Sequence, residues 1–273
     1  MAVERIHWEN LPQATREAVE RYTGTVWSAK TVSEGLNSAI AAVLTTDAGS
    51  VFVKGLHRDY PRRWTQDMEA LINPYVDHLA PRLLWRVEGE WDVLGFELLD
   101  GRHADYQPGS ADLPKVAEAV TALGSITCPD LPVKLAEHRW RHYVADPEEL
   151  EWLKGDRLLH TDYNPLNVLM VDGRAMLIDW AWPTRGAGWI DPACLVLRLM
   201  ANGHSAASAE HVVTDVPAWR TAPEEGLAVF AQACVRMWEE IADANPVEWT
   251  KGMAKAAREW APRRQGAQGS YRA

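Results

Sequence analysis

The sequence predicts an α+β fold in two lobes, a small antiparallel β-sheet followed by a larger and mainly helical part. Two observations carry this prediction. Short β-rich runs separated by turn residues fill the first hundred positions, whereas apolar residues at helical spacing dominate the rest. The change falls near Gly101, so we divide the chain into residues 1–100 and 101–273, with a hinge near residues 97–103.

Five strands and one inserted helix are expected in the first lobe. The β-rich runs are residues 26–32, 39–46, 51–56, 83–89 and 91–99. Polar residues 33–37 and the turn Asp47-Ala-Gly separate the first three runs, which makes them hairpin-linked antiparallel strands. Apolar residues recur at helical spacing from Pro61 to Leu79, which predicts the helix.

The second lobe is predicted to contain helices with two short strands between them. The expected helices are residues 112–126, 146–154, 191–201, 223–243 and 248–260. The second of these begins at Asp-Pro-Glu-Glu, which is a strong start signal. Short apolar runs in residues 157–180 predict a strand hairpin between Val168 and Ile178.

Composition excludes several classes of protein. The 273 residues are 47% hydrophobic and contain no apolar stretch of the roughly 18 residues that a membrane-spanning helix needs. The N-terminus is charged and unlike a signal peptide, so we expect a cytoplasmic protein without a membrane partner. A net charge of −10 argues against nucleic acid as a partner and is compatible with a cationic one. The three cysteines are widely spaced, which favours buried thiols over disulfides.

Three residues between positions 158 and 183 form the chemically informative set. Asp162 and Asp179 each follow a short apolar run, and Asn167 lies five residues after the first of them. Alone, each is typical of a turn or a helix cap. As an ordered set they match phosphoryl transfer, which needs a carboxylate beside the attacking hydroxyl and oxygen ligands for Mg²⁺. The predicted hairpin would bring the three into one corner.

These segments resemble the catalytic and metal loops of the aminoglycoside phosphotransferase family. The resemblance rests on His160-Thr-Asp-Tyr-Asn-Pro-Leu-Asn167 and Ile178-Asp-Trp-Ala-Trp-Pro183. That family is the antibiotic- and choline-kinase-like branch of the protein-kinase-like fold, so the resemblance implies a bilobal kinase with ATP and Mg²⁺ as cofactors. It also implies that Asp162 accepts the hydroxyl proton, that Asn167 and Asp179 hold Mg²⁺, and that His160 supports the loop by hydrogen bonding.

The resemblance further implies a lysine on the third strand and a glutamate on the following helix. Lys54 closes an apolar run and would reach the α- and β-phosphates, although a lysine at the surface end of a strand is the alternative. Glu69 is the expected ion-pair partner, with Asp67 as the alternative on a different helical face.

Two further nucleotide contacts follow from the resemblance alone. The loop that contains Ser33, Gly35 and Ser38 occupies the place where backbone amides would cover the phosphates. The segment from Glu97 to Leu99 would hydrogen-bond the adenine edge through its backbone.

The sequence departs from the family pattern at one point. The family has an aspartate that steadies the catalytic loop where this chain has Leu195. Asp191 either performs that task from a shifted position or caps the helix that follows. The pair His138 and His142 has the spacing of a metal site on a helix, but no third ligand is near in sequence, which favours a solvated face.

The sequence therefore predicts an ATP-dependent phosphotransferase that acts on a hydroxyl of a small molecule. An aminoglycoside or another aminated antibiotic is the leading acceptor, and the alternatives are a metabolic or peptide Ser/Thr kinase and, in another class, a nucleotide-binding pseudokinase. Acidic residues that could contact a cationic acceptor, or could simply be polar helix faces, are Asp191, Glu224, Glu225, Glu239, Glu240 and Asp243.

Overall fold

The computed structural model describes residues 4–33 and 38–269, without the side chains of residues 266–269. The chain divides into two compact units. The first comprises residues 1–102 together with Met176–Ala181, and the second comprises His103–Ala175 and Trp182–Ala273. The sequence-based division had assigned Met176–Ala181 to the second lobe.

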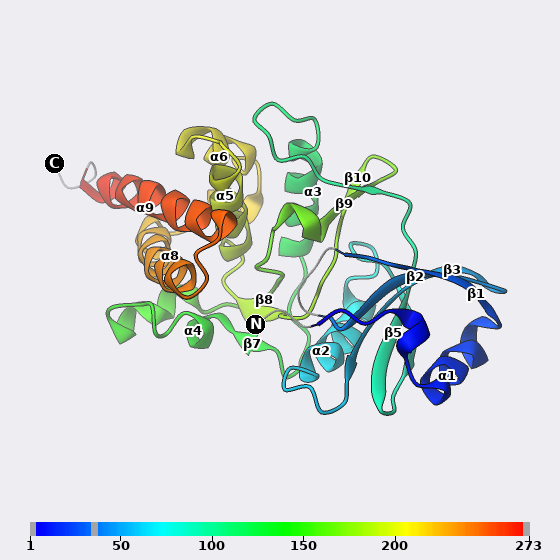
Figure 1. Ribbon diagram of the computed structural model, residues 1–273. Coiled ribbons are helices and arrows are strands. Elements are labelled where there is room, and N and C mark those ends of the chain that lie inside the picture. Colours follow the sequence, from blue (N-terminus) through cyan, green and yellow to red (C-terminus); the bar gives the residue numbers. More distant parts are fainter. Residues whose placement is uncertain (1–3, 34–37, 270–273) are drawn as a thin grey trace. The chain divides into compact units, whose positions relative to one another are not determined.

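The first unit is a β-sheet with two α-helices and two short 3₁₀ helices (Figure 1). Its elements are η1 (Trp8–Asn10), α1 (Gln13–Thr23), β1 (Val26–Thr31), β2 (Ile40–Thr46), β3 (Gly49–His57), α2 (Trp64–Ile72), η2 (Asn73–Tyr75), β4 (Leu83–Val87) and β5 (Trp91–Glu97). The five strands run in the order β1-β2-β3-β5-β4, and every neighbouring pair is antiparallel. This confirms the predicted five-stranded antiparallel sheet.

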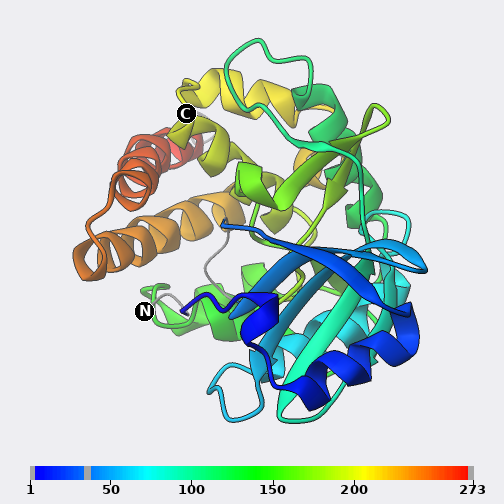
Figure 2. The same cartoon turned by 45° about the vertical axis from the view of Figure 1, so that its right-hand side comes forward.

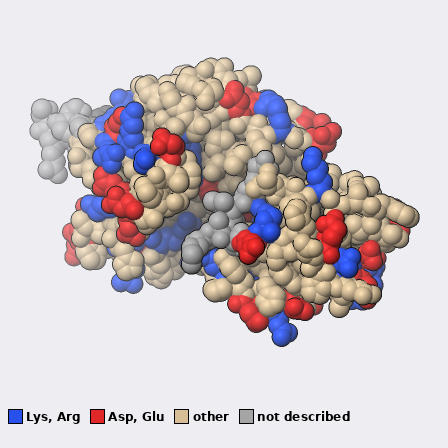
Figure 3. Space-filling model, in the orientation of Figure 1, with Lys and Arg blue, Asp and Glu red and all other residues tan. Residues whose placement is uncertain are grey.

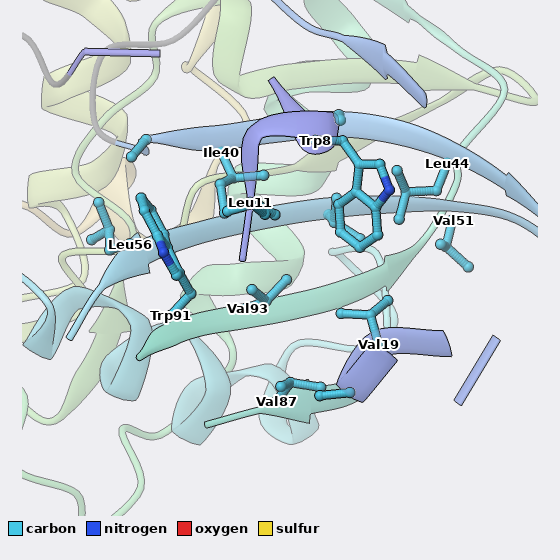
Figure 4. Close-up of a cluster of buried hydrophobic side chains, with 14 of the residues drawn as sticks. Trp8, Leu11, Val19, Ile40, Leu44, Val51, Leu56, Val87, Trp91 and Val93 are labelled. Carbon is cyan, nitrogen blue, oxygen red and sulfur yellow. The ribbon is translucent and has the colours of Figure 1, made fainter. Parts of the chain in front are cut away.

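Side chains from η1, α1 and the sheet form the hydrophobic core of this unit (Figure 4). In β3, Val51 and Val53 belong to this core, whereas Phe52 and Lys54 alternate with them and therefore point to the other face of the sheet. In Figure 2, α1 is the blue helix beside the sheet. It was not predicted, because its buried positions include Thr15, Ala18 and Thr23, which give a weak apolar pattern.

Gly95 is needed where β5 passes beneath an aromatic ring. A Cβ atom at this position would lie 2.2 Å from the indole of Trp85, which is itself buried and stacked on Tyr22. We expect Gly95→Ala to lower the free energy of unfolding by about 1–3 kcal/mol, because the ring would have to leave its place in a packed core. Urea unfolding measures the loss. In Gly252→Ala the new methyl group meets nothing within 4 Å, so this helical control should be neutral or slightly stabilising.

The predicted helix over residues 61–79 is shorter than expected. The structure has α2 from Trp64 to Ile72, and a 3₁₀ turn follows over Asn73–Tyr75. Pro74 lacks the backbone N–H that would continue the i→i−4 hydrogen bonds of the helix, so the α-helix ends there. The buried side chain of Asn73 then donates a hydrogen bond to Pro81 O at 2.8 Å and accepts one from Leu83 N at 2.7 Å. These two bonds fix the start of β4.

The second unit is mainly helical. Its elements are α3 (Leu113–Gly124), β7 (Lys134–Leu135), α4 (Ala136–Arg139), η3 (Pro147–Leu153), β8 (Arg157–Leu159), η4 (Pro165–Asn167), β9 (Val168–Val171), β11 (Thr184–Gly186), α5 (Ile190–Ala201), α6 (Ala206–Val212), α7 (Pro217–Arg220), α8 (Glu224–Ala244) and α9 (Glu248–Gly269). In Figures 1 and 2, α8 and α9 lie side by side. Four of the five predicted helices are present as α-helices. The one predicted over residues 146–154 is instead the 3₁₀ helix η3, which Asp146 caps by accepting from Glu148 N. Helices α6 and α7 were not predicted.

The hairpin predicted between Val168 and Ile178 is present. Strands β9 and β10 (Arg174–Leu177) are neighbours in a sheet, and Asp172 and Gly173 join them with φ angles of 48° and 75°. An Asp-Gly pair with both φ angles positive is the usual solution for a two-residue hairpin turn. The strands β6 (Arg102–His103) and β10 lie where the chain passes from one unit to the other.

Within the described residues, no helix is both long and apolar enough to span a bilayer.

On the face shown in Figure 3, acidic and basic side chains are interspersed.

Candidate active site

The loop that follows β8 contains a strained residue, Thr161, directly before the catalytic candidate Asp162. Thr161 has a φ of 67°, which is uncommon for any residue but glycine and unfavourable for a β-branched one. Its amide donates to Asp191 Oδ1 at 2.8 Å, and its hydroxyl accepts from the Arg139 guanidinium at 2.7 Å. Such strain persists only where the surrounding contacts impose it, and strained residues of this kind cluster at functional sites.

Asp191 steadies the loop that carries Asp162. Its two carboxylate oxygens accept from the amides of His160 and Thr161, at 3.0 and 2.8 Å. Burial raises the pKa of this carboxyl, and the hydrogen bond from the His160 amide opposes the rise. The N-cap residue of α5 is Trp189, without a side-chain cap. Of the two roles that the sequence left open for Asp191, the structure therefore confirms the first.

We expect Asp191→Ala to destabilise the protein and to slow it. Two buried amides would lose their acceptor, at about 1–3 kcal/mol each, so the free energy of unfolding should fall by about 2–6 kcal/mol. Urea unfolding measures this, and kcat should fall as well because the loop that presents Asp162 loses its support. Asp215→Ala, which removes an exposed carboxylate of the same unit, is the control. Equal stabilities of the two variants would show that Asp191 does not hold the loop.

Asp162 is held on one side and open on the other. Its Oδ1 accepts from Arg198 at 2.8 Å and from the Asn164 amide at 3.3 Å, while 48% of the side chain stays exposed. The amide of Asp162 donates to His160 Nδ1 at 3.3 Å, and its carbonyl accepts from Asn167 Nδ2 at 3.3 Å. The loop thus places His160 and Asn167 around Asp162, and an oriented carboxylate of this kind can take a proton from a hydroxyl.

Arg198 was missed by the sequence reasoning. It lies on α5 with 12% of its side chain exposed, and its guanidinium stands over the rings of Trp238 and Trp249, 5.3 and 5.8 Å from their centroids. The signal was present, because Arg198 is the only basic residue of a helix that is otherwise apolar along most of its length. A charge on such a helix needs a partner, and here the partner is Asp162.

Lys54 forms the centre of an ion-pair cluster in the first unit. Its Nζ lies 2.5 Å from Glu69 Oε2 and 3.0 Å from Asp179 Oδ1. Burial by itself lowers the pKa of Lys54, but the two carboxylates outweigh it and raise that pKa. Burial raises the pKa of Glu69, against the attraction of Lys54. The predicted pairing of Lys54 with Glu69 is confirmed, and its role in nucleotide binding stays a prediction.

The alternative partner, Asp67, is occupied elsewhere. Its carboxylate pairs with Arg86 at 2.6 Å and with Arg63 at 3.0 Å. Both arginines also pair with the buried carboxylate of Asp92, at 2.6 and 2.8 Å. This four-residue network ties α2 to β4 and β5 and leaves Glu69 to face Lys54.

A pocket of about 360 Å³ lies beside Asp162 in the second unit. Its polar lining residues are Arg139, Thr161, Asp162 and Arg198. The remaining lining side chains are aromatic, aliphatic or sulfur-containing: Trp140, Trp182, Phe230, Trp238, Trp249, Leu197, Ile241, Met237, Met253, Cys194 and Cys234. A mostly apolar cleft with a few convergent polar groups has the usual composition of a small-molecule site.

The acidic residues proposed as acceptor contacts do not line this pocket. Asp191 supports the catalytic loop, Glu224 pairs with Arg264 at 3.3 Å, and Glu239 pairs with Arg258 at 3.1 Å. Glu240 accepts from the Tyr143 hydroxyl at 3.2 Å.

Several solved structures share this arrangement of strands and helices. Choline kinase LicA from Streptococcus pneumoniae matches with a TM-score of 0.67 at 14% sequence identity, over 92% of this chain and 98% of that chain. An aminoglycoside phosphotransferase from Alicyclobacillus acidocaldarius matches with a TM-score of 0.61 at 12% identity, over 94% and 96%. The macrolide 2'-phosphotransferase MphH from Brachybacterium faecium matches with a TM-score of 0.56 at 16% identity, over 90% and 98%. This chain has the fold of these phosphotransferases.

The predicted protein-kinase-like fold is therefore confirmed by structure rather than by sequence similarity. The sequence matches no protein-family model and no curated protein.

The residues expected to contact the nucleotide lie in the loop before β2 and at the end of β5. Gly35 lies outside the described residues, Ser33 is exposed, and Ser38 is buried with its carbonyl accepting from Arg5 at 2.7 Å. The amide of Glu97 donates to Arg82 O at 3.0 Å, so this donor is already used by the sheet. Leu98 and Leu99 follow the end of β5, and their backbone is the part of the expected hinge segment that lies outside the strand.

The histidine pair does not form a helical metal site. Helix α4 ends at Arg139, so it contains His138 but not His142, and both side chains are exposed.

Proposed function

We propose that this protein transfers the γ-phosphoryl group of ATP to a hydroxyl group of a small molecule, with Asp162 as the catalytic base. The proposal rests on the hydrogen bonds and the exposure of the Asp162 side chain. One of its oxygens is fixed by Arg198 and Asn164, while the side chain stays half exposed at a pocket of small-molecule size. A hydroxyl bound in that pocket could donate its proton to the exposed part of the carboxylate.

The donor side of the reaction rests on Lys54 and on two oxygen-bearing side chains. Lys54 would contact the α- and β-phosphates, with Glu69 fixing its position. Asn167 and Asp179 fit Mg²⁺ chemically, since an amide carbonyl and a carboxylate are the ligands that this ion prefers. The Asn167 nitrogen already donates to Asp162 O, which leaves its carbonyl oxygen for the metal. When bound, Mg²⁺ would neutralise charge on the phosphates.

Nucleotide complexes of the structural neighbours support this assignment. LicA has been solved with AMP, and a variant of the aminoglycoside phosphotransferase APH(4)-Ia with ADP and hygromycin B. We extend nucleotide binding to this chain as part of the proposal, with Ser33, Gly35 and Ser38 near the phosphates and Leu99 near the adenine. A kinase that uses ATP would work in the cytoplasm, where nucleoside triphosphates are made.

The acceptor class follows less directly from the fold, which serves choline kinase as well as aminoglycoside and macrolide phosphotransferases. The resemblance of the catalytic loops puts aminoglycosides and other aminated antibiotics first, and metabolic or peptide hydroxyls second.

The proposal is tested by measuring ADP formation with a panel of acceptors. Aminoglycosides, macrolides, choline, sugars and hydroxy acids are supplied in turn with Mg·ATP. We expect one class to raise ADP formation far above the background hydrolysis, and the rise to disappear in Asp162→Asn. Binding of Mg·ATP without acceptor-dependent turnover in any class would instead indicate a pseudokinase and overturn the proposal.

A further inference from the structure

The pocket beside Asp162 contains more positive than negative charge. Two arginines line it, and Asp162 is its one carboxylate among the described residues. Arg198 is already neutralised by Asp162. Arg139 is different, because its hydrogen bonds go to the hydroxyls of Thr161 and Thr184 and to the carbonyl of Trp182, which are all neutral.

Arg139 therefore has no carboxylate at ion-pair distance among the described residues, and the nearby carboxylates of Asp162 and Asp191 attract it only from farther away. In the described part of the chain, no carboxylate oxygen lies within 4.0 Å of its guanidinium, and burial lowers its pKa. A partly buried guanidinium that lacks an anionic partner is unfavourable, since its desolvation is not repaid by an ion pair. Such an unfavourable charge on a pocket wall is expected where a ligand supplies the missing anion.

The aromatic walls of the pocket are already in contact with the protein's own cations. Arg198 stands over Trp238 and Trp249, Arg139 lies 5.0 Å from the ring centroid of Trp140, and Lys134 lies 4.7 Å from that of Trp182. Aromatic rings that bind a ligand ammonium do so by offering their negative faces to it. A cationic ligand here would approach rings that already have cations on them, and it would lie beside the Arg139 guanidinium, and both effects oppose its binding.

We propose that the acceptor is a hydroxylated small molecule with an anionic group next to an apolar part, and that Arg139 binds the anion. The inference rests on the proposed function, because it places the acceptor hydroxyl at Asp162. Thr161 connects the two groups, since its hydroxyl accepts from Arg139 and its chain neighbour is Asp162. The apolar part of the acceptor packs against the tryptophan and methionine side chains of α8 and α9. This acceptor class differs from the polycationic one that the resemblance put first.

Binding of matched aryl probes tests this inference without turnover. Benzoate, phenyl phosphate, benzamide and benzylamine share one ring and differ in charge, so each is titrated into the whole protein by calorimetry in the absence of nucleotide. We expect an anion to bind best and benzylamine to bind worst. If benzoate is the stronger of the two anions the acceptor group is a carboxylate, and if phenyl phosphate is stronger it is a phosphate.

Variants of Arg139 separate a binding role from a structural one. Arg139→Gln should weaken the preferred anion about tenfold or more and leave benzamide nearly unchanged, because the anion loses a charged hydrogen bond that benzamide does not make. Arg139→Lys keeps the charge and should restore part of the preference. Arg220→Gln, at an exposed arginine at the end of α7, is the control and should change nothing. If Arg139→Gln weakened all four probes equally, its role would be structural and the inference would be wrong.

The remaining outcomes are also decisive. Equal or tighter binding of benzylamine, or failure of all four probes to bind, would overturn the inference. Phosphoryl transfer to cationic acceptors alone would overturn it while leaving the proposed function in place. Anion binding that depends on Arg139, in a protein that phosphorylates nothing, would leave the anion site standing and remove the kinase proposal.

Discussion

Asp162→Asn is expected to lower kcat by about 10²–10⁴-fold, the usual contribution of a general base. Asparagine keeps the shape of the side chain and can still accept from Arg198 and Asn164 through its oxygen. It cannot accept the proton of the acceptor hydroxyl. Affinity for Mg·ATP should stay within a few-fold, because the proposed nucleotide contacts lie on other residues.

Single-turnover kinetics with an identified acceptor and a separate titration of ATP measure the two quantities. Asp130→Asn, at an exposed aspartate of the same unit, is the control and should retain the wild-type rate. The stability of Asp162→Asn should fall by about 1 kcal/mol, since a charge-assisted hydrogen bond to the largely buried Arg198 becomes a neutral one. Transfer at a near wild-type rate by a variant that still binds ATP would remove Asp162 from the mechanism.

Lys54→Met should have the second largest effect, and it should act on both activity and stability. Loss of a preorganised cation at the phosphates should lower kcat/KM by about 10²-fold or more. The change also leaves Glu69, whose side chain is 6% exposed, facing Asp179 without a cation. Removing one partner of a buried ion pair typically lowers the free energy of unfolding by about 3–5 kcal/mol.

The pH dependence of that loss follows from the carboxylate that remains. The pKa of Glu69 is already raised by burial, and without Lys54 the lowering effect of the lysine disappears. A carboxyl with a raised pKa binds its proton more tightly in the folded state than in the unfolded state, so stability falls as pH rises through that window. Lys54→Met should therefore be more stable at pH 5 than at pH 8 in urea unfolding, relative to the wild type.

A double variant separates the two effects of Lys54. In Lys54→Met/Glu69→Gln the buried charge is removed from both partners, so we expect much of the lost stability to return while kcat/KM stays low. A single Lys54→Met variant with wild-type kcat/KM would remove Lys54 from nucleotide binding. Recovery of activity in the double variant would show that the single variant fails through misfolding.

The strands and the main chemical residues follow from local sequence patterns. Residues that alternate along a strand or recur along a helix are neighbours through the backbone, so periodicity is enough to place β1 to β5, α5, α8 and α9. The choice of Lys54 and Glu69 came from the family resemblance, which implies a lysine on the third strand and a glutamate on the following helix. The 3₁₀ turns at residues 73–75 and 147–153 were harder, because the same spacing of apolar residues suits either helix type over one or two turns.

The sequence by itself determined the five-stranded sheet and the long helices α5, α8 and α9, and it predicted Asp162, Asn167 and Asp179 as the site residues. Only the tertiary structure decided that Asp191 holds the catalytic loop, that Arg198 pairs with Asp162 and that Arg139 faces a pocket without a carboxylate partner. The physical reason is distance along the chain. Arg198 is 36 residues from Asp162, and the pocket draws its lining from α4, the catalytic loop, α5, α8 and α9. Ion pairs and pockets depend on which segments meet in space, and the periodicity of residues along one helix or strand carries no information about that.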